Sequence, residues 1–226
     1  MSKFISDELF AKWAAQWQAL EHSREPFNFF KSGDQLLLGD YFDSADLETL
    51  VSTPGITVIK VRFGFDTEEK QFKLVLFGVD SAGQIITPYY AHAPADFRPS
   101  GDGPGGNVPD VLAKQWIRYW EEKGHADDIT STLFRSQYGF LNGYNYPVKE
   151  LIAALFNFTK MPKYYIRFVL HRYFKFAEEP GIGDLEASYT FGLLFQAIPD
   201  QKESGLIGPD ADSGYYDLSA PCPRTC

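Results

Sequence analysis

Residues 56–90 read ITVIKVRFGFDTEEKQFKLVLFGVDSAGQIITPYY, and this stretch decides the fold class. In 56–65 and in 71–79 apolar side chains alternate with polar ones, which is the period of a β-strand with one buried face. The connections DTEEK and DSAG are short turns, so consecutive strands are expected to pair antiparallel. Residues 84–90 form a third strand, and Pro88, which has no N–H to donate, predicts that this strand lies at a sheet edge. The stretch therefore predicts an antiparallel meander.

The rest of the chain adds a hairpin and several helices to this meander. Residues 164–176 and 187–198 are strand candidates on either side of a Gly- and Pro-containing turn. Apolar residues at helical spacing, with capping residues before them, predict helices near 7–20, 45–53, 112–120 and 148–156. We therefore expect an α+β fold in which an antiparallel sheet of about five strands packs three to four helices on one face.

The composition excludes some classes of function but does not identify one. The chain has 226 residues, a formal net charge of −9 and 16% aromatic residues. An acidic chain is a poor general binder of nucleic acid. Charged residues interrupt the N-terminal apolar residues, and no stretch is long enough to span a membrane, so we expect a cytoplasmic protein without a membrane span. The aromatic residues fit a large core, and they also fit a ligand pocket or a protein interface.

The organisation of the chain indicates one domain. No internal repeat is apparent, and no linker divides two cores. Residues 1–198 are expected to form a single α+β domain, and residues 199–226, which are rich in Gly, Pro and Asp, an extended tail packed on that domain.

Three segments resemble a family of bacterial proteins for which no activity is known. These are VIKVRFGFD at 58–66, LVLFGVDSAG at 74–83 and the ending PCPRTC at 221–226. Members of that family have a similar strand pair, which ends in a Gly-Val-Asp-x-x-Gly turn, and a similar Cys-Pro ending. The resemblance covers roughly residues 45–85 and the last few residues. It implies a bacterial origin and one integral domain, and it carries over no catalytic residue.

The strand periods also predict which side chains point away from the core. On the three longest strands these outer side chains are basic or aromatic, although the whole chain is acidic. If the strands are neighbours, they form a positive stripe that receives an acidic protein, an anionic ligand or the chain's own acidic tail. An ordinary solvated sheet face is the alternative. The predicted binding residues are Lys60, Arg62, Lys73, Arg167, His171, Tyr173 and Lys175.

Two other groups of residues offer different chemistry. His92, Asp96 and Arg98 lie in a long loop over 91–108, where a His and an Asp are able to act as an oriented general base and an Arg is able to hold an anion. Cys222 and Cys226 are four residues apart, which suits a reversible disulfide or a soft metal ion.

Acidic residues near the C-terminus form one further candidate site. Asp210 and Asp212 begin an acidic turn that resembles the start of a calcium loop. The turn lacks the acidic third ligand and the terminal Glu that such a loop needs, so an ordinary acidic turn is the better interpretation.

The hypothesis that follows is a non-catalytic binding or interaction protein, which acts alone or as a component of a larger assembly. Its partner is expected to be another protein or an anionic ligand, with no nucleic acid and no cofactor. A small hydrolase with its site under the 91–108 loop is one alternative. A metal- or redox-responsive protein that uses the Cys pair is the other.

Overall fold

The fold is taken from a computed structural model, which describes residues 3–42, 44–92, 107–136, 138–155, 163–176, 185–198, 215–217 and 220–222. The α-helices are α1 (Asp7–Gln18), α2 (Ser44–Val51), α3 (Asp110–His125) and α4 (Val148–Leu155). Short 3-10 helices are η1 (Ala19–His22), η2 (Asn28–Phe30) and η3 (Ser131–Phe134).

The longer strands make up two antiparallel sheets. The six-stranded sheet has the order β1 (Lys3–Ile5), β7 (Tyr89–His92), β6 (Gln71–Val79), β5 (Val58–Asp66), β10 (Gly143–Pro147) and β14 (Ala220–Cys222). The four-stranded sheet has the order β13 (Tyr215–Tyr216), β12 (Leu185–Ile198), β11 (Lys163–Phe176) and β4 (Gly39–Phe42). The strand pairs β2 (Lys31–Ser32) with β3 (Gln35–Leu36) and β8 (Arg135–Ser136) with β9 (Gly139–Phe140) form two small hairpins.

The two sheets share one core. The inner face of the six-stranded sheet contributes Val61, Phe63 and Leu74, and the inner face of the four-stranded sheet contributes Ile166 and Phe168. All of these side chains are almost completely buried, so the sheets face each other as a sandwich. The α+β class, the antiparallel pairing and the presence of four α-helices among the described residues confirm the fold class expected from the sequence.

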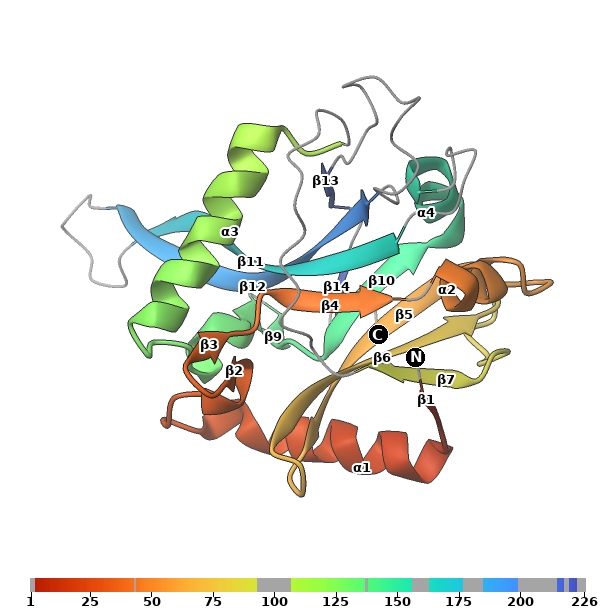
Figure 1. Ribbon diagram of the computed structural model, residues 1–226, viewed down its shortest axis with the longest axis horizontal. Coiled ribbons are helices and arrows are strands. Elements are labelled where there is room, and N and C mark those ends of the chain that lie inside the picture. Colours follow the sequence, from red (N-terminus) through yellow and green to blue (C-terminus); the bar gives the residue numbers. More distant parts are fainter. Residues whose placement is uncertain are drawn as a thin grey trace.

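The long helices cover the two outer faces, and they lie on opposite sides of the sheets in Figure 1. Trp13 of α1 packs with Val75 and Phe77 on the outer face of the six-stranded sheet. Ile117 of α3 packs with Val169 on the outer face of the four-stranded sheet. The sequence predicts one sheet with helices on one face, whereas the strands divide between two sheets with a long helix outside each.

The division into two sheets reflects an internal repeat, which the sequence analysis did not detect. Residues 3–92 and 107–217 present the same order of elements: a long helix, one or two short 3-10 helices, a small hairpin of two-residue strands, a short strand, a short helix, a long hairpin and a final strand; the first copy has two 3-10 helices and the second has one. The edge contact is repeated as well, since Ile5 pairs with Tyr89 in the first copy and Val108 pairs with Tyr215 in the second. The chain therefore contains the same structural unit twice.

Identical residues occupy equivalent positions in the two copies, but they are few and widely spaced. The helices align Asp7, Trp13, Trp17 and His22 with Asp110, Trp116, Trp120 and His125. Further along the chain the repeat aligns Gly39 with Gly143, Arg62 with Arg167, Phe72 with Phe191, and Tyr89-Tyr90 with Tyr215-Tyr216. The distance between equivalent residues grows along the chain because the second copy has longer strands and connections, and this growth hides the repeat from a search at a fixed period.

The short strand of each copy pairs with a long strand of the other copy, so the two copies exchange these strands. β4 of the first copy pairs with β11 of the second, and β10 of the second copy pairs with β5 of the first. In each exchanged strand a glycine pairs in register with an arginine of the neighbouring strand: Gly39 pairs with Arg167, and Gly143 pairs with Arg62. A Cβ atom at either glycine would collide with a backbone carbonyl of the facing strand, so only glycine fits at these two crossings.

Several local predictions can now be compared with the structure. The meander is confirmed as β5, β6 and β7, although the third strand covers Tyr89–His92 and not the predicted 84–90, and the second hairpin is confirmed as β11 and β12. The edge position predicted for the strand with Pro88 is wrong, because β7 lies between β6 and β1. Pro88 precedes β7, so its missing N–H removes no hydrogen bond from the sheet.

The tail predicted for 199–226 is described only at 215–217 and 220–222. In these two places it forms β13 and β14, one in each sheet. No helix among the described residues is long and apolar enough to cross a membrane.

Candidate functional site

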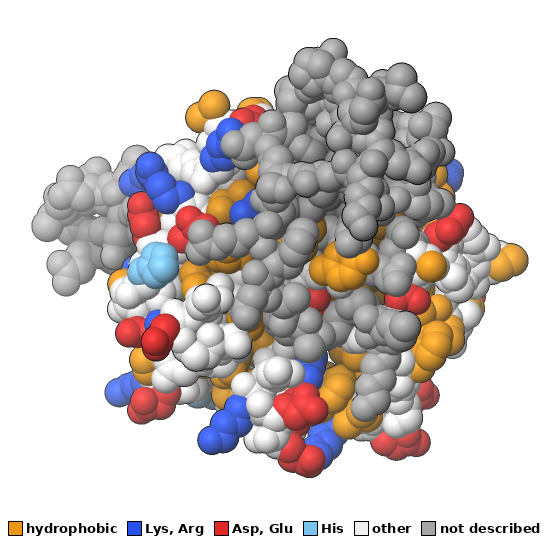
Figure 2. Space-filling model, viewed as in Figure 1, with side chains coloured by type: hydrophobic (Ala, Val, Ile, Leu, Met, Phe, Trp, Pro, Cys, Tyr) orange, Lys and Arg blue, Asp and Glu red, His pale blue; other side chains and the backbone are white. Residues whose placement is uncertain are grey.

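The predicted basic residues lie on two different faces of the molecule. Lys60, Arg62 and Lys73 are in the six-stranded sheet, and Arg167 and His171 are in the four-stranded sheet. Since the inner faces of the two sheets meet in the core, the outer faces point in opposite directions. The three strands are therefore not all neighbours, and the condition under which they would form one positive stripe is not met. On the face shown in Figure 2, blue and red side chains are interspersed among the described residues, and no continuous blue stripe crosses them.

Arg62 is a structural residue. It is 8% exposed, and its guanidinium donates to the carbonyl oxygens of Tyr144 (3.0 Å) and Val61 (3.2 Å) and to Oδ1 of Asn145 (2.8 Å). Burial lowers the pKa of Arg62 to about 10, so the group stays charged at neutral pH. These bonds tie β5 to the exchanged strand β10. Lys60, its neighbour on the same face, has a lowered pKa because of its partial burial and the positive charge of Arg62.

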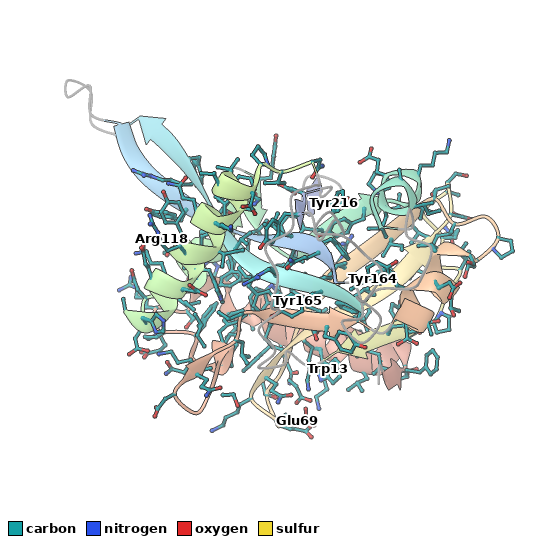
Figure 3. The ribbon with its side chains drawn as sticks, turned by 45° about the horizontal axis from the view of Figure 1, so that its top comes forward. Trp13, Glu69, Arg118, Tyr164, Tyr165 and Tyr216 are labelled. Atoms are coloured by element: carbon teal, nitrogen blue, oxygen red, sulfur yellow. The ribbon has the colours of Figure 1, made fainter. Side chains whose placement is uncertain are left out.

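Lys73 is also held within the fold. Its ammonium group donates to the carboxylate of Glu69 and to Oε1 of Gln71 (2.6 Å), and it lies 5.5 Å from the centre of the Trp13 ring. Trp13 approaches the backbone of β5 closely at Gly64, where an added Cβ would stand 3.0 Å from the Trp13 Cβ. Figure 3 shows Trp13 and Glu69 at the same end of the molecule. Lys73 therefore secures α1 on the sheet and offers little to an external anion.

Arg167 has a different environment. It is half-buried, and the structure gives its guanidinium no hydrogen bond or ion pair with any described residue; its Nε atom is buried without an acceptor. Among the described residues, it lies close to the ring of Tyr165, whose centre is 5.9 Å from the guanidinium carbon. Tyr165 is labelled at the middle of the four-stranded sheet in Figure 3. A half-buried cation without an acceptor is costly, because hydrogen bonds to water are lost without replacement.

His171 lies further along the same face of β11. Its imidazole contacts the ring of Trp116 (4.3 Å between ring centres), and its Nε2 lies 3.8 Å from Oδ2 of Asp217. It extends over Gly192, where an added Cβ would stand 2.8 Å from the ring. Burial lowers the pKa of His171 below its ordinary value, and the nearby Asp217 carboxylate opposes that shift.

The remaining two predicted binding residues lie beyond the core. Tyr173 is 41% exposed. Lys175 belongs to β11, but the structure describes only its backbone. Arg172 interrupts the apolar pattern because this end of the hairpin projects past the core: its side chain is exposed and its Nη1 lies 3.4 Å from the Tyr119 hydroxyl.

A buried acid between the sheets was not anticipated from the sequence. Asp40 of β4 is 1% exposed; its Oδ1 accepts from the Tyr41 backbone N–H (2.7 Å), and its Oδ2 has no partner among the described residues. Burial raises the pKa of Asp40 well above its ordinary value, with a smaller opposing effect from Lys73. The sequence LLLGDYF around it indicated only a short apolar run, and the one available signal was an acid inside that run.

The alternative sites fall mostly outside the described residues. His92 is the last residue of β7, while Asp96 and Arg98 are not described. Cys222 ends β14, where it pairs in register with Gly143, and Cys226 is not described. Asp210 and Asp212 also lie outside the described residues. Within the part of the chain that the structure describes, no three His, Cys, Asp or Glu residues come together in a way that would hold a metal ion.

The aromatic residues serve the core. Trp17 contacts a group of aromatic rings at the junction of the two copies, and Trp120 contacts a second group at the equivalent place. Of the described aromatic side chains, only Phe4, Tyr138 and Tyr173 are substantially exposed. The aromatic excess therefore supports packing more than an interface.

Comparison of the chain with protein-family models, with curated proteins and with solved structures finds no match.

Proposed function

We propose that this protein is a non-catalytic binding protein, and that Arg167 receives an anionic group of its partner or ligand. The observation that carries the proposal is the absence of a hydrogen-bond acceptor or counter-charge for the Arg167 guanidinium among the described residues. An arginine presents several N–H donors in a planar fork that suits carboxylate and phosphate groups.

The internal repeat supplies a control for this interpretation. Arg62 stands at the equivalent position of the first copy and has its acceptors inside the protein, where the Asn145 side chain and the Tyr144 carbonyl oxygen lie within 3.0 Å. At Arg167 the position equivalent to Asn145 is occupied by Tyr41 of the first copy, which does not supply an amide oxygen. The equivalent arginine is therefore hydrogen-bonded within the protein in one copy, whereas in the other it has no acceptor among the described residues.

The surroundings of Arg167 favour binding over catalysis. Tyr165 gives the guanidinium an aromatic neighbour, and no ion pair joins Arg167 to any described residue. An anion bound here would meet a fixed positive charge at the edge of a low-dielectric region, where such contacts are stronger than in water.

The test compares Arg167→Gln with Arg62→Gln. Binding of a polyglutamate peptide and of citrate is measured by calorimetry at low ionic strength, and unfolding is measured by urea titration. We expect Arg167→Gln to weaken binding at least about tenfold and to change stability little, because one charge-assisted contact is lost from the complex only. We expect Arg62→Gln to retain binding and to lose about 1–3 kcal/mol of stability, because buried acceptors lose their donor.

Unchanged binding in Arg167→Gln would contradict the proposal, as would the absence of binding of either probe to the unmodified protein. A loss of binding in Arg62→Gln alone, with its fold intact, would move the site to the other face.

A further inference from the structure

A polar cavity of about 430 Å³ lies where the two copies of the repeat meet. One wall is the end of η1 and the two residues after it, and the other is Thr130, the start of η3 and the first residue of β8. The lining consists of Glu21, His22, Ser23, Arg24, Thr130, Ser131, Thr132 and Arg135. None of these side chains is purely apolar, and the volume falls in the range of small-molecule sites.

The repeat places an equivalent cavity at the other junction, and that cavity is almost closed. It has a volume of about 10 Å³ and is lined by Pro26, Phe27, Asn28, Lys31, Gly124, Asp127 and Ile129. The repeat relates Thr130, Ser131 and Thr132 to Pro26, Phe27 and Asn28, and it relates Glu21 to Gly124. Small hydroxyl side chains therefore stand where the closed junction has the larger Phe27 and Pro26 rings.

The two junctions differ in the charged side chains at equivalent positions. In the closed junction Lys31 forms an ion pair with Asp127. In the open junction the equivalent residues are Arg135 and Arg24, so two cations replace a cation and an anion. The closed junction therefore contains an internal ion pair, whereas the two cations of the open junction favour a negatively charged ligand.

Glu21 neutralises only part of this positive charge. Arg135 donates through Nη2 to the Glu21 carbonyl oxygen (2.9 Å), and the same nitrogen lies 3.7 Å from Oε1 of Glu21. That carboxylate also accepts from Gln18 (3.0 Å). Arg24 is exposed and has neither an ion pair nor a hydrogen bond to any described residue.

The hydroxyl groups of the lining indicate which kind of uncharged group a negatively charged ligand would carry. Thr130 and Thr132 share a hydrogen bond of 2.8 Å, and Ser131 donates to the Ser23 carbonyl oxygen (2.8 Å). Each hydroxyl retains further hydrogen-bonding capacity. The lining offers no aromatic ring other than the His22 imidazole, so it suits a hydroxyl-rich ligand better than a flat apolar one.

We propose that this cavity binds a small phosphate monoester with a hydroxylated body, such as a polyol or sugar phosphate. The phosphate lies between Arg24 and Arg135, and the body lies along the hydroxyls of Thr130 and Thr132. This site is separate from the one proposed at Arg167, since none of its lining residues belongs to β11.

The experiment titrates the full chain with glycerol 3-phosphate, inorganic phosphate and glycerol, with binding followed by calorimetry. We expect glycerol 3-phosphate to bind at least about tenfold more tightly than inorganic phosphate and glycerol not to bind. Arg24→Gln is expected to weaken the ester about tenfold or more, because it removes one charge-assisted contact. Arg118→Gln, on the solvent side of α3 (Figure 3), makes the same change of charge away from the cavity and is expected to bind normally.

A second variant tests the comparison of the two junctions directly. Arg24→Asp places at the open junction the acid that Asp127 provides at the closed one, and we expect it to pair with Arg135, to keep the fold and to abolish binding of the ester. Absence of ester binding to the unmodified protein would overturn the proposal. Equal affinity for ester and inorganic phosphate, or equal losses in Arg24→Gln and Arg118→Gln, would overturn it as well.

Discussion

Trp17 and Trp120 occupy equivalent positions in the two copies, and each donates its indole N–H to a backbone carbonyl of the other copy. Trp17 reaches the Leu141 carbonyl oxygen at 2.8 Å, and Trp120 reaches that of Leu37 at 2.9 Å. Both side chains are fully buried among aromatic rings. The two tryptophans therefore fasten the copies together in a reciprocal manner, beside the reciprocal exchange of β4 and β10.

This relationship predicts similar losses when either tryptophan is shortened. Trp17→Phe and Trp120→Phe each leave a buried carbonyl without its donor and a gap in the core, and each is expected to lose about 2–4 kcal/mol of the free energy of unfolding. Trp116→Phe is the matched control, because Trp116 is only partly buried. Urea titration measures all three variants, and a loss in Trp116→Phe as large as in the other two would contradict the role of the indole donors.

The buried Asp40 predicts a pH dependence of stability. Its pKa is raised above the ordinary value of 3.8, so below about pH 3.8 the acid is neutral in both states and imposes no penalty. As the pH rises, the unfolded chain releases this proton while the folded protein retains it, and stability falls by up to about 1.4 kcal/mol per pH unit until the folded pKa is passed.

Asp40→Asn is expected to remove this decline, because the amide does not ionise. The melting temperature of the variant relative to the unmodified protein should rise as the pH increases above about 3.8 and should level off once the raised pKa of Asp40 in the folded protein is passed. The exposed Asp34→Asn serves as the control and should show no such trend. A difference that stays constant across this range would show that Asp40 does not keep its proton in the folded state.

His171 predicts the opposite dependence of stability on pH, because its pKa is lowered and not raised. Burial lowers its pKa below the ordinary value of 6.5, so the folded state favours the neutral imidazole. The associated stability is present above about pH 6.5 and is lost as the pH falls through the lowered pKa. Asp217, whose carboxylate lies 3.8 Å from Nε2, raises the pKa of His171 against the effect of burial.

We therefore expect Asp217→Asn to lower the pKa of His171 further. Proton NMR of the imidazole ring over pH 4–8 measures the change directly, and the exposed His125 provides an internal reference. A His171 that titrates above 6.5 in the unmodified protein, or a rise in its pKa in Asp217→Asn, would contradict this account.

Local patterns in the sequence were sufficient to predict the long helices and the long strands, but not the short strands. The alternation in 58–66 and 71–79 depends only on which face of each strand is buried, and β5 and β6 follow it. The spacing of Trp13 and Trp17 predicted a helix for the same reason, since the periods of strand and helix are set by the backbone itself. The outer positions of Arg62 and Arg167 were likewise readable from period-two counting.

What the tertiary structure alone decided is which strands are neighbours. The exchange of β4 and β10 depends on contacts such as Gly39 with Arg167 and Gly143 with Arg62, which join residues far apart in the chain. It places the predicted basic residues on opposite faces and makes Arg62 structural, while Arg167 keeps donors without an acceptor among the described residues. The cavity at Arg24 and Arg135 arises in the same way, because each of its walls comes from a different copy. A periodic pattern in the sequence reflects which face of one element is buried. The pairing of two distant strands depends on the complementary shapes and charges of both strands, and the local sequence of either strand does not show this complementarity.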